Sequence, residues 1–426
     1  MLKAISRYGV RMPPDAEQII EARYRRGQLV EGPDIAAFER AFALRLGDGT
    51  AIGTSYGRMA FYLMLKALDL PAGSEIVFPA LTFWVIPEMA RVAGLQPVFA
   101  DIDPGTFALD PGAFERAIGP RTRAVVPTHL FGLPCDMDPI MRLARRHKLA
   151  VIEDCAHALG ASYKGQPVGT FGDGALFSFQ TIKPLNALGG GLAYLTDRTL
   201  SVRVAELAAA ERRPTPARVG KRLLSGWFHR LFTRPGTFTF SQFPILWSAS
   251  WFGANPDVYF WEAIRPLDRF PDDYPERFAN VHAALALAGL ERLDEWTART
   301  QAHARMMSGF LGDLRGVQLP VVPDDRRHVY YQYCVYTPSR DEIVKRCIRR
   351  GVDLETLHVD VCSRLPLFQA FRAEAPNAER TTQVIQAPIH SSLTDAEIER
   401  VGQTIRDAVL DITREVESRV PAERSA

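Results

Sequence analysis

The sequence predicts an α/β protein in which a mainly parallel β-sheet lies between two layers of helices. Between residues 50 and 195, short segments rich in β-branched and aromatic residues alternate with segments that show helical spacing of apolar residues. Short strands of this kind that alternate with helices are typical of a parallel sheet covered on both faces. The C-terminal part reads instead as helix, strand and helix, which predicts a smaller α+β domain.

The first elements form a strand–turn–helix unit. We expect a helix over residues 34–46, where apolar residues recur at helical spacing and a glycine follows. The apolar stretch 50–52 predicts a short strand, and the glycine-containing segment 53–57 predicts a turn. A helix should follow over 59–70, and its hydrophobicity indicates that it is largely buried.

The same alternation continues along the chain. We expect strands in EIVFPA, QPVFADI, AVVPTHLFG, LAVIED, ALFSFQ and GGLAYLT, and helices in PEMARVAGL, AFERAIG and DPIMRLARRH. In parallel α/β sheets, ligands bind outside the carboxyl ends of the strands. Functional side chains are therefore expected where these strands end.

The C-terminal part contains a predicted long helix over residues 282–314, a strand-like segment VYYQYCVYT, a helix over 341–350 and an amphipathic helix that begins at residue 395. We accordingly divide the chain into an N-terminal arm, a large domain with an insertion, and a small C-terminal domain. Their predicted bounds are 1–30, 31–275 with the insertion at about 205–270, and 276–426.

Composition excludes several functional classes. Hydrophobic residues make up 47% of the chain and charged residues 23%, the balance of a globular protein rather than a disordered, collagen-like or coiled-coil chain. The formal net charge of +2 argues against general nucleic-acid binding, which requires a broad basic surface. The five cysteines are scattered and form no C-x-x-C motif, so neither a disulfide framework nor a metal site is expected. Without a recognisable signal peptide or long apolar run, we expect a cytoplasmic protein.

Two of the predicted strand ends carry groups capable of chemistry. Glu153 and Asp154 end the strand LAVIED, a position where a carboxylate often only caps a helix. Lys183 lies between the strand that contains Ser178 and the glycine-rich loop 189–191. Such a lysine is commonly a surface residue. It can instead be an amine nucleophile, because burial or a nearby cation readily lowers its pKa.

A third feature is the turn GTSYGR at residues 53–58, which opens a predicted helix. Backbone N–H groups at a helix N-terminus can bind an anion, although a tight turn alone would show the same sequence. An amine, an acid and an anion site together are what pyridoxal 5'-phosphate requires. Lys183 would form the Schiff base, and Asp154 would keep the ring nitrogen protonated because an opposite charge favours the charged form. Phe83, past another strand end, is the candidate to stack on the ring.

At these residues the sequence resembles the DegT/DnrJ/StrS family of sugar aminotransferases, which are fold-type I, pyridoxal-phosphate-dependent enzymes. The resemblance begins at GQLVEGP (27–33), which is similar to the family's opening G-x-L-x-x-G-P, and extends to the C-terminal helix. Further matching stretches are GSEIVFPALTF, PVFADIDPGTFALDP, AVVPTHLFGLPCDMD, VIEDCAHALGASYKG and IQAPIHSSLTDAEI. The resemblance weakens between about 200 and 275, and it implies a seven-stranded sheet of the fold-type I kind.

The resemblance also implies roles for individual residues. Lys183 would form the internal aldimine and shuttle a proton, and Asp154 would hold the pyridine nitrogen. His157 stands where the family usually has glutamine and would hydrogen-bond the ring 3-oxygen. Phe83 would stack on the ring. Gly189 occupies the place of an acid that is common in the family's glycine loop.

The implied phosphate site departs from the family pattern. Ser178 and the N–H groups of Gly57 and Arg58 would bind the phosphate, but the family's Ser-Gly-Thr turn reads Tyr-Gly-Arg at 56–58. A family asparagine that reaches the phosphate across the dimer is replaced by Pro275. We hypothesise that Arg58 compensates by placing a cation on the phosphate, because a cation at a helix N-terminus is otherwise unfavourable. The alternative is an exposed arginine without a function.

The implied activity is transfer of an amino group from an amino acid, with glutamate as the expected donor, to a nucleotide-linked keto-sugar by a homodimer with ping-pong kinetics. A cyclitol or other ring ketone is an alternative acceptor. A second enzymatic interpretation is a pyridoxamine-dependent sugar dehydratase, which Lys183 disfavours because such relatives replace the lysine. An inactive, membrane-associated regulator is the non-enzymatic alternative, which the intact set of Asp154, Ser178 and Lys183 disfavours.

The segment 212–256 differs from the rest of the chain. It contains no Asp or Glu, seven Lys or Arg, and nine Trp or Phe. Within it, KRLLSGWFHRLF predicts a helix with one apolar face. We favour a dimer interface or substrate lid in which the aromatic side chains are buried. The alternatives are peripheral contact of 219–252 with the inner face of a membrane, and binding of a diphosphate-linked substrate by the basic residues.

Overall fold

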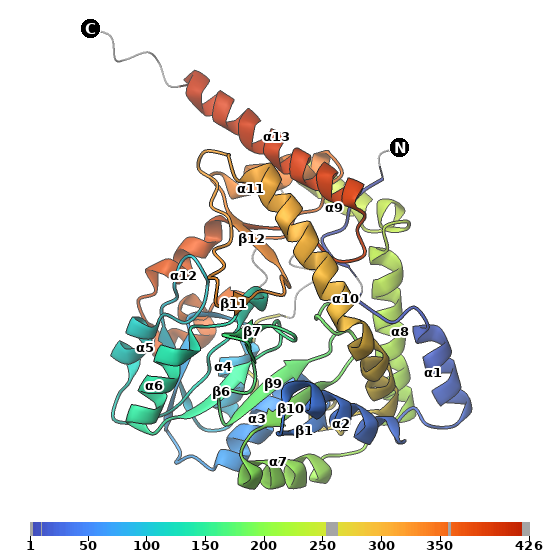
Figure 1. Ribbon diagram of the computed structural model, residues 1–426, viewed down its shortest axis with the longest axis vertical. Helices are drawn as coiled ribbons and strands as arrows, with labels where there is room; N and C mark the ends of the chain where they lie inside the picture. The colour runs from blue at the N-terminus through green and yellow to red at the C-terminus, as the bar shows by residue number, and fades with distance from the viewer. Residues whose placement is uncertain (1–2, 10, 253–262, 357–358, 420–426) are drawn as a thin grey trace.

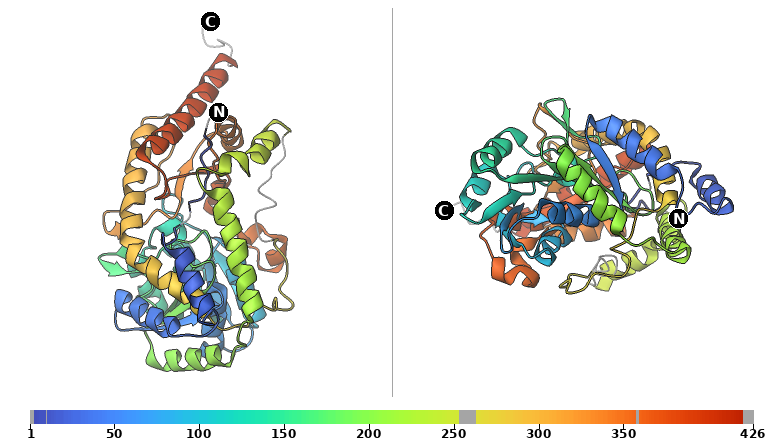
Figure 2. Two further views of the ribbon diagram at one scale, coloured as in Figure 1. Left: turned by 90° about the vertical axis from the view of Figure 1, so that its right-hand side faces the viewer. Right: turned by 90° about the horizontal axis from the view of Figure 1, so that it is seen from below.

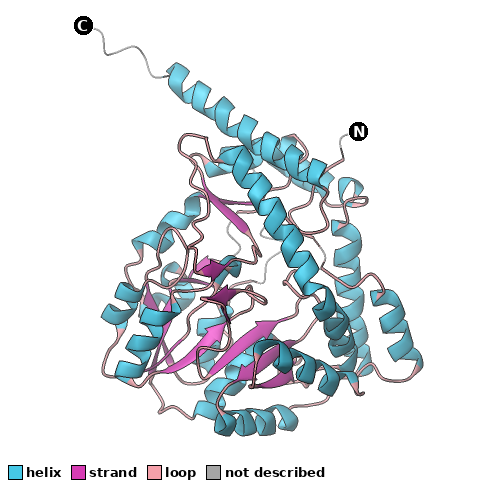
Figure 3. Cartoon of the chain, in the orientation of Figure 1, coloured by secondary structure: helices cyan, strands magenta, loops and turns pink. Residues whose placement is uncertain are grey.

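The structure is a computed structural model that describes residues 3–9, 11–252, 263–356 and 359–419. A seven-stranded sheet forms its centre, with helices on both faces (Figure 1, Figure 3). Across the sheet the strands are β1 (Thr50–Thr54), β10 (Gly191–Leu195), β9 (Gly174–Ser178), β6 (Ala150–Asp154), β5 (Thr122–Val125), β2 (Glu75–Pro79) and β4 (Gln96–Ala100).

The sheet is mainly parallel, as predicted. β10 runs antiparallel to both of its neighbours, β1 and β9, while every other neighbouring pair is parallel. β9 and β10 follow each other along the chain without a crossover helix, and strands joined in this way pair antiparallel.

Successive side chains of a strand point to opposite faces of the sheet, so each face packs against its own layer of helices. In β2, Ile76 and Phe78 pack into one hydrophobic core and Val77 into the core on the opposite face, as the period of two in a strand requires. The helices of the first layer are α3 (Gly57–Leu68), α4 (Val85–Val92) and α7 (Arg198–Ala210). Those of the second are α2 (Asp34–Leu46), α5 (Pro111–Ala117), α6 (Met137–His147) and α10 (Asn280–Leu311), with α1 (Ala16–Arg25) beside α10.

The C-terminal part has its own hydrophobic core. Its elements follow the predicted order of helix, strand and helix. α10 packs against α2 at one end and against the C-terminal helix at the other, so it connects both cores (Figure 1). The predicted domain boundary at 275–276 lies just before α10 and stays a prediction. The elements of the C-terminal core are β12 (Tyr333–Tyr336), β14 (Val384–Ala387), α11 (Arg340–Arg349) and α13 (Asp395–Arg419), and α12 (Pro376–Arg380) lies between them in sequence.

Short strand pairs attach the C-terminal part to the large sheet region. β3 (Leu81–Thr82) pairs antiparallel with β13 (Asp360–Val361), which places the chain around residue 360 next to Phe83. A second small sheet joins β11 (Arg326–Arg327) to β7 (Ser162–Tyr163), which also pairs with β8 (Gln166–Pro167). Both pairings bring C-terminal segments to the carboxyl ends of the central strands.

The insertion forms α8 (Pro216–Thr233), a short 3-10 turn at 238–240 and α9 (Phe243–Phe252) on one edge of the molecule (Figure 2). Residues 253–262 lie outside the described part. The predicted apolar face of α8 is divided, because Leu223 is buried while Trp227 and Phe228 stay 38% and 43% exposed. The other exposed large apolar side chains of this segment are Leu224, Phe232, Phe240, Ile245, Trp247, Trp251 and Phe252. Among the described residues, none of the helices has the length and hydropathy needed to span a bilayer.

Candidate active site

A cavity of about 240 Å³ lies at the carboxyl ends of β6 and β9. All of the predicted site residues line it, although they come from widely separated parts of the sequence. These residues are Gly57, Arg58, Phe83, Asp154, His157, Ser178 and Lys183. The cavity is completed by mainly apolar or hydroxyl-bearing side chains, among them Tyr56, Ile86, Thr128, Leu130, Leu176, Ile182 and Val359.

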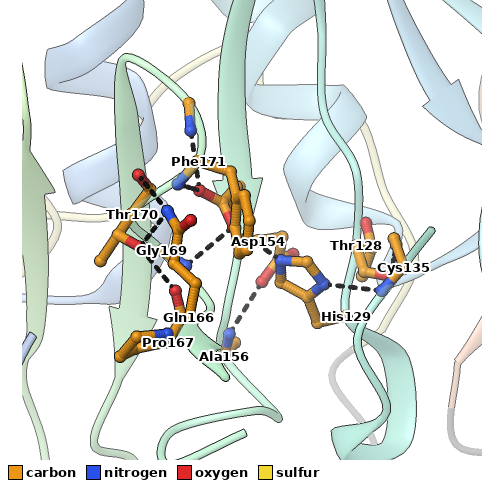
Figure 4. Close-up of polar contacts among 12 residues, drawn as sticks. Thr128, His129, Cys135, Asp154, Ala156, Gln166, Pro167, Gly169, Thr170 and Phe171 are labelled. Carbon is orange, nitrogen blue, oxygen red and sulfur yellow. Dashed lines mark hydrogen bonds and ion pairs between the residues drawn. The ribbon is translucent and has the colours of Figure 1, made fainter. Parts of the chain in front are cut away.

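Asp154 and Glu153 have opposite environments because successive side chains of β6 point to opposite faces of the sheet. Asp154 faces the cavity, where Oδ1 accepts a hydrogen bond of 3.0 Å from the N–H of Ala156 (Figure 4). Burial raises the pKa of Asp154, while the Ala156 N–H and the nearby Lys183 oppose that shift. The negative charge of Asp154 is therefore costly at this buried position, and a cation beside it would stabilise it.

Glu153 is completely buried and belongs to a structural network. Its carboxylate accepts hydrogen bonds from the backbone N–H groups of Gly169, Phe171 and Gly172, and it lies 2.9 Å from Nε2 of His129. These contacts attach the end of β6 to the loop that leads into β9. The sequence analysis did not assign this role, since the pattern LAVIED does not say which carboxylate faces the cavity.

His129 connects this network to the next strand end. Its Nδ1 accepts a hydrogen bond of 3.0 Å from the N–H of Cys135 (Figure 4). Nε2 therefore carries the proton that is donated to Glu153. His129, Glu153 and Cys155 form the one group of three possible metal ligands within the described ranges. The atoms of His129 and Glu153 are already occupied by hydrogen bonds, and we therefore assign them a structural role.

Lys183 is the amine of the cavity. Its Nζ lies 2.8 Å from Nε2 of His157 and 5.4 Å from the ring centre of Tyr331. Burial lowers the pKa of Lys183 to about 8, an effect that Asp154 opposes and the Arg58 guanidinium reinforces. Tyr331 in turn stacks on His157 with ring centres 4.1 Å apart. Sequence reasoning missed Tyr331, because nothing in the strand-like pattern VYYQYCVYT distinguishes it from a core residue.

The N-terminus of α3 forms the opposite end of the cavity. No side chain caps this helix, whose preceding residue Tyr56 is extended. A Cβ atom at Gly57 would lie 2.8 Å from the carbonyl oxygen of Phe177, and one at Gly191 would collide with the backbone N of Gly57. Glycine at both positions thus allows the start of the helix to approach the strands closely, next to Ser178 at the cavity.

Arg58 is half-buried rather than fully exposed, and it lies among three aromatic rings. Its guanidinium carbon is 5.6 Å from the ring centre of Phe83, 5.5 Å from that of Tyr56 and 5.1 Å from that of Tyr274, and it donates a hydrogen bond to the Tyr274 hydroxyl. Cation–π contacts of this kind hold the charge in place at the cavity wall.

A steric contact explains why position 189 is a glycine and not the acid that is common in the family's glycine loop. The φ of Gly189 is +154°, and a Cβ at this position would lie 3.0 Å from Cε1 of His282. His282 is itself buried, and burial lowers its pKa to about 4. An acidic side chain at position 189 would have to displace this ring.

A mainly parallel sheet with a half-buried lysine and a buried carboxylate at its carboxyl edge is the arrangement expected of an α/β enzyme of the fold-type I aminotransferase class. Residues 13–223 and 273–406 match the model of the DegT/DnrJ/EryC1/StrS aminotransferase family. The chain belongs to this family. The unmatched residues 224–272 coincide with most of the insertion.

Curated relatives cover most of the chain. It is similar to the GDP-perosamine synthase of Caulobacter vibrioides, with 32% identity over 87% of this chain and 88% of that protein. It is also similar to the UDP-N-acetyl-3-dehydro-alpha-D-glucosamine 3-aminotransferase of Acidithiobacillus ferrooxidans, with 30% identity over 87% of both chains.

Solved structures are also similar to this chain in fold and in sequence. DesV of S. venezuelae, in complex with a ketimine intermediate, superposes with a TM-score of 0.73 and 28% identity over 92% of this chain and 94% of that chain. AtS13 from Actinomadura melliaura has a TM-score of 0.77 and 26% identity over 95% of this chain and 99% of that chain. These similarities confirm the predicted family and fold class.

Proposed function

We propose that this aminotransferase uses pyridoxal 5'-phosphate to move an amino group from an amino acid, with glutamate as the expected donor, to a nucleotide-linked keto-sugar. The observation that carries the proposal is the buried Lys183 amine, which shares one cavity with Asp154 and an uncapped helix N-terminus. The names of the two curated relatives, which both concern nucleotide-linked sugars, support the class of acceptor.

The cavity residues fit this cofactor. Asp154 would hold the ring nitrogen, Phe83 would contact the ring face, and Ser178 with the first N–H groups of α3 would hold the phosphate. When bound, the cofactor supplies an electron-withdrawing ring that stabilises negative charge at Cα of the donor. The buried setting strengthens each of these electrostatic contacts because little water remains to screen them.

Lys183 would remove the proton from Cα of the donor and return it at the cofactor side, since its lowered pKa places a usable fraction of neutral amine near neutral pH. His157 would orient this amine through the 2.8 Å contact and hydrogen-bond the ring 3-oxygen. Tyr331 packs on the His157 ring and restricts its rotation.

The proposal is tested by offering the purified protein with bound cofactor a panel of amino acids, each alone, and following the cofactor spectrum. We expect glutamate to convert the cofactor and release 2-oxoglutarate, and a nucleotide-linked keto-sugar added afterwards to reverse the conversion. Conversion by no amino acid in the panel would refute the proposed transamination.

We expect replacement of Arg58 by alanine to weaken binding of pyridoxal 5'-phosphate about tenfold or more, because a charge-assisted contact to the phosphate is lost. Affinity is measured by fluorescence titration of the apoprotein. Pyridoxal, which lacks the phosphate, is the matched control ligand; at a pH well above the Lys183 titration, where the amine is neutral in both proteins, it should bind the variant and the unmodified protein equally. Equal losses for both ligands would show that Arg58 only maintains the cavity wall.

The rate of pyridoxal attachment to the apoprotein should rise with pH around a midpoint of about 8, far below the ordinary lysine value of 10.5. Below that pH Lys183 is protonated and cannot attack, and above it the amine is neutral. The Arg58→Ala variant should move the midpoint upward, since the guanidinium helps to lower the pKa of Lys183. A midpoint near 10 in the unmodified protein would contradict the buried, low-pKa environment.

We further propose that the protein is a cytoplasmic homodimer and that a second copy, or a substrate lid, covers the aromatic surface of α8 and α9. The alternative is that the aromatic surface of α8 and α9 contacts an anionic membrane surface, which would attract the basic residues of the insertion. Several of these cations already pair within the chain: Arg218 contacts Glu276, Arg222 contacts Asp273, and Arg213 contacts Glu31.

We expect the protein not to float with vesicles that contain anionic phospholipid, and to have the mass of a dimer in light scattering. Introduction of negative charge by Trp247→Glu together with Trp251→Glu should shift the mass toward the monomer. Flotation of the unmodified chain that is lost on deletion of 219–252 would instead support membrane contact.

A further inference from the structure

We infer that a small polar pocket beside the main cavity binds a carboxylate of the amino donor through the guanidinium of Arg11. This inference rests on the proposed function and adds to it a residue for donor recognition. Arg11 belongs to the N-terminal arm, to which the sequence analysis assigned no chemical role.

The pocket has a volume of about 30 Å³ and is lined by Arg7, Tyr8, Arg11, Tyr331, Gln332 and His390, together with three apolar positions. A space of this size admits a group as small as a carboxylate and no sugar ring. Ile182 lines both this pocket and the main cavity. Tyr331 also lines the pocket, and the centre of its ring lies 5.4 Å from Nζ of Lys183. A donor whose amino group faces Lys183 would therefore extend its carboxylate in this direction.

Arg11 is only 7% exposed, and its hydrogen bonding is incomplete. Nη2 donates to Oγ1 of Thr300 at 3.0 Å, and this hydroxyl in turn donates to the carbonyl oxygen of Trp296. Nη1 is buried without a hydrogen-bond partner, and Arg11 forms no ion pair, within the described ranges. Burial lowers the pKa of Arg11 to about 10, so the group is still a cation at neutral pH.

The acids around the pocket are engaged by other groups. Asp353 is held by Arg7 through contacts of 2.6 to 2.9 Å. Glu355 accepts hydrogen bonds from the hydroxyl of Tyr8 and the side-chain amide of Gln332.

His390 is neutral, because burial lowers its pKa to about 4, so it neither adds a second cation nor offsets the charge of Arg11. Within the part of the chain that the structure describes, the guanidinium of Arg11 is therefore a buried charge without a counter-ion. A buried charge without a partner is strongly unfavourable, and a carboxylate can pair with a guanidinium through two parallel hydrogen bonds. A donor carboxylate would supply the missing negative charge and occupy Nη1.

The test uses glutarate, a dicarboxylate that has no amino group and cannot react, as the probe. Calorimetric titration of the protein with bound cofactor should show glutarate binding that weakens about tenfold or more in Arg11→Gln. The exposed Arg145→Gln variant carries the same change of charge and should bind glutarate as the unmodified protein does. Removal of the unpaired charge should also leave the melting temperature of the ligand-free Arg11→Gln variant unchanged or raised, which separates weak binding from misfolding.

Equal glutarate affinity in Arg11→Gln and the unmodified protein would overturn the inference, as would equally tight, Arg11-dependent binding of inorganic phosphate, which would make the pocket a general anion site. The outcome is separable from that of the proposed function. An unchanged KM for glutamate in Arg11→Gln, with turnover intact, refutes only the donor site. Arg11-dependent glutarate binding in a protein that no amino acid converts refutes only the transamination.

Discussion

Replacement of Lys183 by alanine is expected to remove the covalent attachment of the cofactor and to lower turnover by about 10³-fold or more. Two functions are lost together, because the same amine would bind the cofactor and move the proton at Cα. Both are measured directly, as the absorbance of bound cofactor after gel filtration and as the rate of 2-oxoglutarate release from glutamate.

Lys164→Ala is the matched control for this prediction. Lys164 is an exposed lysine that pairs with Asp138 at 2.6 Å outside the cavity, so its loss should leave both measurements unchanged. Turnover by Lys183→Ala close to that of the unmodified protein would refute the assignment of the catalytic amine.

The Asp154→Asn variant should lose about 10²-fold or more in turnover while its apoprotein becomes at least as stable as the original. Asparagine keeps the acceptor for the Ala156 N–H but removes the negative charge that would stabilise the protonated ring nitrogen. Burial raises the pKa of Asp154 in the folded protein. At pH values above the ordinary carboxyl range, ionisation of Asp154 therefore destabilises the folded state relative to the unfolded chain. The penalty grows as the pH rises through the unfolded pKa, and asparagine removes it.

Glu153→Gln supplies the contrast, because it changes the adjacent carboxylate in the same way. The amide nitrogen would replace either the oxygen that accepts from Gly169 or the oxygen that accepts from Phe171 and Gly172, so at least one N–H group would meet a donor, and we expect a loss of about 3 kcal/mol or more in unfolding free energy. Denaturant unfolding of both apoproteins and their turnover at saturating cofactor measure the two effects. Lower stability for Asp154→Asn than for Glu153→Gln would reverse the assignment of the two carboxylates.

Much of the fold was predictable because its strands and helices differ strongly in hydrophobic period. The segments around Ile76 and Ile152 contain short continuous apolar runs and form central strands, and the amphipathic segment from Asp395 forms the C-terminal helix. The antiparallel direction of β10 was not predicted. Its only signal is the absence of a helix between Ser178 and Gly191, which the alternating pattern elsewhere obscures.

The residues of the candidate site were likewise predictable only in part. Residues that follow strand ends, such as Asp154, Ser178 and Lys183, could be proposed from the sequence, because parallel topology brings strand ends together. Arg11 and Tyr331 could not, since each reaches the cavity region from a distant segment whose local pattern carries no chemical signal. Glu153 and Asp154 are both buried and differ in their surroundings, a network of backbone N–H groups for Glu153 and the cavity for Asp154, which is also a property of the folded chain alone.

The antiparallel pairing of residues 81–82 with 360–361 has a consequence for the order in which the protein is made. The ribosome completes Lys183 long before it reaches Tyr331 and Val359, which stand against the lysine and the cavity. A nascent chain that stops short of these residues lacks part of the cavity wall and the aromatic ring 5.4 Å from the lysine Nζ. We therefore expect the low-pKa environment of the lysine to be complete only after both residues have been synthesised.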